Sequence, residues 1–154
     1  MVKNLQLKLV VPLLLAGLAG CGDGSIGTVT GTVKLDGEPL ADARVTFYPQ
    51  IDASEAFDNA GTSAGRTDEN GVYELIYNRD TKGALVGEHL VYIETLQEGG
   101  GGDYGQGRKE MVPKRYNSES ELKVTVKSGS NTIDFLDLTS EGDKNVGRNV
   151  EGAY

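Results

Sequence analysis

The chain has 154 residues, which suffices for one domain with short accessory segments. Its 22 glycines and the scarcity of long helical patterns favour strands and turns over helices. The formal charge is −8 and becomes −10 without residues 1–20, which contain Lys3 and Lys8. Such a polyanion repels phosphate backbones, so we exclude nucleic acid as a partner, and attachment to an anionic membrane would require a lipid.

Residues 1–20 have the pattern of a secretory signal peptide. Two lysines lie near the start, an apolar stretch covers residues 9–18, and the small residues Ala19 and Gly20 precede Cys21. A basic start, a short apolar segment and small residues before a cleavage site are typical of such signals. The apolar stretch is too short to cross a hydrocarbon core of about 30 Å comfortably.

The segment Leu18-Ala19-Gly20-Cys21 resembles a lipobox, the signature of bacterial lipoproteins. The resemblance implies cleavage between Gly20 and Cys21 and attachment of a diacylglyceryl group to the Cys21 thiol, and two acyl chains suffice for stable anchoring. Cys21 is the only cysteine, so no intramolecular disulfide can form. The following residue is Gly22 rather than Asp, which favours the outer over the inner membrane of the cell envelope. We interpret residues 21–26 as a short tether.

Residues 27–139 alternate apolar and polar side chains with the period of two that is typical of half-buried strands. In the first strand, Val29, Gly31, Val33 and Leu35 fall on one face. The segment 36–39 predicts a tight turn, because Asp-Gly accepts positive φ and proline ends the ladder. We predict seven strands, over residues 28–35, 43–48, 63–67, 72–77, 89–96, 122–127 and 132–138.

The same alternation predicts which later side chains enter the core, namely Ala43, Val45, Phe47, Tyr73, Leu75, Tyr77, Val91 and Ile93. Ser128–Asn131 is predicted to be a turn, and a change of parity predicts a β-bulge near Phe135–Asp137. Residues 97–111 contain six glycines and are predicted to form a mobile loop. Residues 140–154 are polar and aperiodic, which predicts a disordered tail.

Short strands at regular spacing predict an all-β fold over residues 27–139, and specifically a seven-stranded Greek-key β-sandwich. Three stretches, residues 31–47, 67–73 and 87–91, resemble the carboxypeptidase regulatory-like, transthyretin-like sandwich domains. Residues 112–117 together with Thr139 resemble small lipoproteins that are abundant in planctomycete-type bacteria. The resemblance implies a prealbumin-like sandwich with an accessory, adhesive or scaffolding role.

One glycine pattern matches a nucleotide-binding motif, but the helix that must follow such a motif is not predicted here. Gly100, Gly102 and Gly105 match G-x-G-x-x-G. A dinucleotide loop must open a helix whose N-terminus meets the pyrophosphate, and Gly107 followed by Pro113 prevents a good helix here. We interpret the segment as a flexible linker and predict no cofactor.

The sequence also gives little support for a metal site or an active site. If Gly71 were the turn glycine of a calcium loop, Arg66 would take the first ligand position and Tyr77 the place of the bidentate glutamate. His89 is the only histidine, whereas zinc sites need several His or Cys ligands, and no serine lies in a nucleophile elbow. We therefore interpret His89 as a strand-edge residue and predict no metal site, no catalytic residue and no enzyme activity.

Three functions remain open at this level. The first is a non-catalytic, lipid-anchored envelope protein whose sandwich contacts an envelope protein. The second is a carbohydrate-binding module at the cell surface, for which Tyr48, Tyr92 and Tyr104 are the candidate exposed aromatics. The third is a hydrolase of unknown substrate. Transthyretin-like hydroxyisourate hydrolases use several histidines and a characteristic carboxy-terminal motif, which this chain, ending Glu151–Tyr154, lacks.

Overall fold

The computed structural model describes residues 25–51, 61–96 and 107–144. In these residues the chain is all-β apart from one 3-10 turn, η1 (Lys114–Tyr116). The strands are β1 (Ile26–Leu35), β2 (Glu38–Pro39), β3 (Arg44–Pro49), β4 (Ser63–Arg66), β5 (Val72–Glu74), β6 (Ile76–Asn78), β7 (Thr81–Lys82), β8 (Ala84–Leu85), β9 (Gly87–Glu94), β10 (Lys123–Val126), β11 (Gly129–Thr132) and β12 (Phe135–Leu138).

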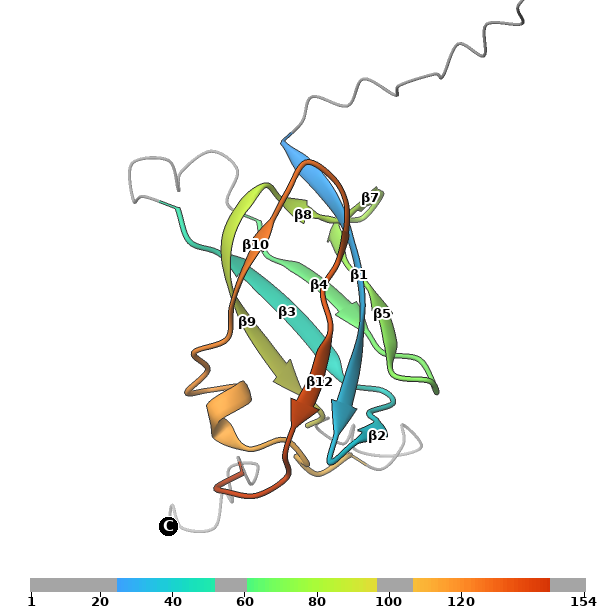
Figure 1. Cartoon of the computed structure of the whole chain (residues 1–154), viewed down its shortest axis with the longest axis vertical. Coiled ribbons are helices and arrows are strands. Elements are labelled where there is room, and N and C mark those ends of the chain that lie inside the picture. Colours follow the sequence, from blue (N-terminus) through green and yellow to red (C-terminus); the bar gives the residue numbers. More distant parts are fainter. Residues whose placement is uncertain (1–24, 52–60, 97–106, 145–154) are drawn as a thin grey trace, which may run out of the picture.

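The strands form two sheets that enclose one apolar core (Figure 1). In the first sheet, β1 is the long central strand, with β11 and β12 paired to it in parallel and β2, β5 and β8 paired antiparallel. The second sheet has the order β10-β9-β3-β4-β6-β7, with every pair antiparallel. The all-β prediction is therefore confirmed.

The core consists of the alternate residues that the sequence pattern selects. Val29 and Val33 of β1 are fully buried, as are Phe47 of β3 and Val91 and Ile93 of β9. Because successive side chains of a strand point to opposite faces, each inward residue places its two neighbours outside. A fully buried side chain of this size contributes about 1.5–3 kcal/mol to folding.

The predicted strand 72–77 is divided between the two sheets. β5 pairs with β1 in the first sheet, whereas β6 pairs with β4 in the second. Leu75 lies between them, fully buried, and its N–H donates to the Val29 carbonyl at 3.0 Å. The chain thus crosses the edge of the sandwich at this residue. Tyr73 and Leu75 still face the core as predicted, and Tyr77 is half-buried.

The prediction of a turn at Ser128–Asn131 is wrong, because residues 129–132 form β11, a parallel neighbour of β1. The Asn131 side chain stabilises this pairing by donating to the Thr28 carbonyl at 3.1 Å and accepting from the Lys127 N–H at 2.9 Å. The predicted β-bulge is confirmed. Between Val33 and Leu35 the pairing of β1 with β12 moves by one extra residue on β12.

The first residues of the predicted tail 140–154 are ordered in the structure. The Ser140 N–H donates to Asp36 Oδ1 at 2.9 Å, and the Lys114 N–H donates to the Asp143 carbonyl at 2.7 Å. Backbone hydrogen bonds to the body of the domain therefore hold residues 140–144, although their side chains are polar. Residues 145–154, and residues 97–106 of the predicted mobile loop, lie outside the described residues.

Two neighbouring residues of β3 give a direct test of this packing. We expect Phe47→Ala to destabilise the fold by about 3–5 kcal/mol, because it opens a cavity between the sheets. Tyr48→Ala removes an outward side chain and is expected to cost at most about 1.5 kcal/mol. Urea unfolding of both variants measures the difference, and equal losses for the two would contradict the assigned faces.

Candidate functional site

The outer surface of the second sheet carries Tyr48, the one aromatic residue that is exposed among the residues the structure describes. We call this surface the tyrosine face and define it by Tyr48 of β3, Leu90 and Tyr92 of β9, Ala64 of β4 and Ile76 of β6. The strand register brings these residues together: Tyr48 lies opposite Leu90, and Thr46 lies between Ala64 and Tyr92. Ala64 in turn lies opposite Ile76, so this row crosses four strands, with the buried polar residue Thr46 between Tyr92 and Ala64.

Tyr48 and Tyr92 form the centre of the tyrosine face. Their ring centroids are 4.8 Å apart with an interplanar angle of 69°, an edge-to-face contact. Tyr48 is 43% exposed, and Tyr92 is half-buried. Such a contact contributes about 0.5–1.5 kcal/mol beyond the buried area and favours this relative orientation of the two rings.

Charged and polar groups surround this aromatic pair. Arg44 of β3 lies opposite both Glu94 of β9 and Arg66 of β4, and Lys123 of β10 lies opposite Leu90. Arg66 is held in place by an ion pair with Asp42 at 2.6 Å. The surface therefore offers ring faces flanked by hydrogen-bond donors and acceptors, an arrangement suited to a ligand with apolar patches and many hydroxyl groups.

The other tyrosines singled out in the sequence do not join this face. Tyr73 is buried against Phe47 and Phe135, with ring centroids 6.5 Å away in both cases, and its hydroxyl donates to the Ile133 carbonyl at 2.7 Å. Burial raises the pKa of Tyr73 far above its usual range. Tyr104 lies outside the described residues.

His89 is not a strand-edge residue, which corrects the sequence prediction. It faces the core from β9, which pairs with β3 on one side and β10 on the other, and it is only 1% exposed. Its ring packs 5.7 Å from the ring of Phe47, and Nδ1 lies 3.2 Å from the Gly87 carbonyl. Burial lowers the pKa of His89, although the hydrogen bond to Gly87 opposes this shift.

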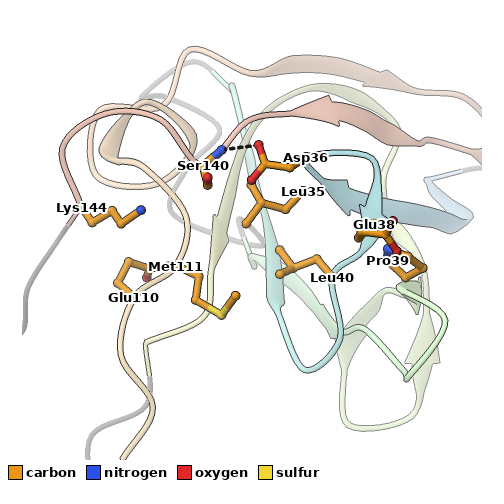
Figure 2. A pocket seen from close by; sticks show the side chains of 9 residues that line it. All are labelled: Leu35, Asp36, Glu38, Pro39, Leu40, Glu110, Met111, Ser140 and Lys144. Carbon is orange, nitrogen blue, oxygen red and sulfur yellow. Dashed lines mark hydrogen bonds between the residues drawn. The ribbon is translucent and has the colours of Figure 1, made fainter.

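A pocket of about 470 Å³ opens at the end of the sandwich where β1 ends and β2 begins (Figure 2). Leu35, Leu40 and Met111 supply its apolar wall, and Asp36 and Lys144 lie at its rim. Hydrogen bonds from Ser140 hold the pKa of Asp36 below its ordinary value, and the positive charge of Lys144 acts in the same direction. The pocket therefore combines an apolar wall with charged groups of both signs.

Glu110 lines this pocket, and its carboxylate forms hydrogen bonds within the protein itself. Its carboxylate accepts from the backbone N–H groups of Thr95, Leu96 and Val112 and from the Thr95 hydroxyl, at 2.8–3.2 Å. These bonds fix the segment after β9, so we assign Glu110 a structural role. This role could not be predicted, because Glu110 belongs to no alternating pattern and its partners Thr95 and Leu96 lie 14–15 residues earlier in the chain.

The residues predicted for lipidation and cleavage, Cys21 and Gly20, lie outside the described residues, which begin at Ser25. Within residues 25–51, 61–96 and 107–144, no group of three or more His, Cys, Asp or Glu side chains is placed to hold a metal ion. The same residues contain no helix long and apolar enough to cross a membrane.

No family model matches the chain, and neither does any curated protein sequence. A crystal structure of a Pseudomonas aeruginosa protein named "putative carbohydrate binding protein" is similar to it, with a TM-score of 0.40 and 14% identity. The match covers 79% of this chain and 92% of that one.

His89 makes the stability of the fold depend on pH. The folded protein binds the His89 proton more weakly than the unfolded chain does, so the full stability is present above pH 6.5 and decreases as the pH falls below that value. Most carboxylates titrate near pH 4, below this window. We expect urea unfolding between pH 7.5 and 5.5 to show this decrease in the wild type and a flatter profile in His89→Phe or, if that variant does not fold, His89→Gln. Parallel profiles would refute the role of His89.

Proposed function

We propose that this chain is a lipid-anchored protein of the bacterial cell envelope whose β-domain is a non-catalytic binding module. The tyrosine face is its ligand surface. The observation that carries the proposal is the preformed pair of Tyr48 and Tyr92 at the centre of an open sheet face. Exposed apolar patches framed by polar groups are typical of binding surfaces.

The anchor part of the proposal rests on the segment Leu18–Cys21 and on where the fold begins. β1 starts at Ile26, five residues after Cys21, so the β-domain follows the proposed anchor almost directly. With Gly22 after the cysteine, we favour the outer membrane. Two acyl chains would hold the acidic domain at the bilayer, where its net charge alone would not.

We also propose that the seven strands predicted from the sequence form the Greek-key framework of a carboxypeptidase regulatory-like, transthyretin-like sandwich, to which the short strands β2, β7, β8 and β11 are added. The segments that carry the resemblance support this. Residues 31–47 build the succession β1-β2-β3, and residues 67–73 make the turn into β5. In that turn, the Asp68 side chain accepts from the N–H groups of Asn70 and Val72 at 2.8 and 2.9 Å.

Carbohydrate is the ligand class that the tyrosine face favours over protein. The faces of pyranose rings carry C–H groups that pack on aromatic rings, and their hydroxyls hydrogen bond to charged side chains at the edge. Tyr48 supplies the exposed ring, and Arg44, Glu94 and Lys123 lie in the surrounding positions. The row from Tyr92 to Ile76 takes one residue from each of four strands and includes Thr46, and this mixed character suits a chain of sugar rings better than a broad apolar protein interface.

The anchor can be tested by metabolic labelling with an alkyne fatty acid. We expect the wild type to incorporate the label and to sediment with the membrane fraction. Cys21→Ser should incorporate none and move to the soluble fraction, because it removes the sulfur that accepts the lipid. A labelled Cys21→Ser variant, or an unlabelled wild type, would contradict the anchor.

The ligand class can be tested on a glycan array that includes bacterial envelope polysaccharides. We expect the wild type to bind, Tyr48→Ala and Tyr92→Ala to lose at least tenfold in affinity, and Tyr48→Phe to lose less, because phenylalanine keeps the stacking ring. Val72→Ala, an exposed position on β5 of the other sheet, is the matched control. A wild type that binds no glycan, or tyrosine variants that bind normally, would remove carbohydrate as the ligand.

A further inference from the structure

The two ends of the sandwich differ in their distance from the proposed anchor. β1 begins at Ile26 beside β8 and β11, because Ile26 lies opposite Leu85 and Gly27 lies opposite Gly129. We call this the tether end. At about 3.3 Å per residue, the ten residues of β1 carry the chain roughly 30 Å to the opposite end, where β2 lies (Figure 1).

The tether end lies close to the residue that would carry the lipid. Cys21 precedes Ser25 by four residues, and four residues span at most about 14 Å when fully extended. The carbonyl of Ser25 accepts a hydrogen bond from the Val86 N–H at 2.8 Å. The backbone of Val86 is therefore fixed to the point where the tether joins the fold.

An exposed apolar side chain and a cation occupy this position together. Val86 is 43% exposed although it is apolar. The register places Val126 opposite Gly87, which brings the exposed Lys127 next to Val86. Valine favours the apolar part of a bilayer surface, and lysine buries its alkyl stem there while its ammonium group reaches the lipid phosphates.

The opposite end has a different character. The pocket there is lined by Asp36, Glu38 and Glu110, with Lys144 as the one cation among its lining residues. An anionic leaflet repels a surface of this kind more strongly than it repels the surface around Val86 and Lys127. The charges at the pocket and around Val86 and Lys127 therefore favour the same orientation as the tether does, with the tether end towards the membrane.

We propose that the tether end of the sandwich rests on the lipid surface, with Val86 at the boundary of the headgroups and Lys127 beside the lipid phosphates. The proposal rests on the lipid anchor proposed above. In this orientation β1 runs away from the membrane and the pocket faces outward, about 30 Å from the leaflet. In this orientation the tyrosine face is roughly perpendicular to the membrane plane, so it stays accessible to a long ligand.

Site-specific quenching in vesicles tests this orientation. The full chain, acylated in a bacterial host, has no free thiol at Cys21, so an introduced cysteine is the only site for a maleimide fluorophore. We would place it at Val86→Cys, at Val72→Cys and at Lys123→Cys, and reconstitute each protein in vesicles of phosphatidylethanolamine and phosphatidylglycerol. Val72 is the matched control, since it is also a valine, is 44% exposed, and lies opposite Thr32 towards the far end of β1.

With a nitroxide-labelled lipid in the vesicles, we expect the probe at residue 86 to be quenched at least threefold more than the probe at residue 72 or 123. Equal quenching at residues 86 and 72 would overturn the orientation, and strongest quenching at residue 123 would show that the tyrosine face lies on the membrane instead. The intact mass of each protein separates the two proposals. Acylated protein without preferential quenching refutes only the orientation, whereas unacylated protein refutes the anchor and the orientation together.

Discussion

Along most strands of this domain, side chains point alternately into the core and to the outside, and this alternation determines what the outer surfaces carry. On β3, Phe47 must enter the core, and Tyr48 is consequently turned outward. On β9, the burial of Val91 and Ile93 has the same effect on Tyr92 between them. The antiparallel pairing of β3 with β9 then brings the two tyrosines into contact. The residues of the proposed ligand surface thus point outward because their neighbours on the same strands are buried in the core.

This dependence explains how much of the molecule could be predicted from sequence. The inward faces of β1, β3 and β9 followed from period-two patterns, and so did the exposure of Tyr48, because burial acts on every second residue. The bulge in β12 was visible as a change of parity around Phe135. What could not be seen was how the strands divide between the sheets. Leu75 continues an unbroken pattern while its strand crosses from one sheet to the other.

Elements held by backbone or side-chain hydrogen bonds rather than by apolar burial escaped prediction. Residues 129–132 have the composition of a turn, yet Asn131 and the parallel pairing with β1 make them a strand. The pocket combines residues from a predicted mobile loop and a predicted tail, because Glu110 and Ser140 order those segments through polar contacts. His89 was misplaced for a related reason, since a lone polar residue in an apolar strand does not reveal which strands flank it.

If the tyrosine face binds the ligand, an NMR titration of the ¹⁵N-labelled protein with oligosaccharides released from bacterial envelope polysaccharide will locate the contact on it. We expect the shifted amides to cluster on β3 and β9 around Tyr48 and Tyr92, while those around Leu40 and Met111 in the pocket stay unchanged. Shifts confined to the pocket, or no shifts at saturating concentrations, would contradict it.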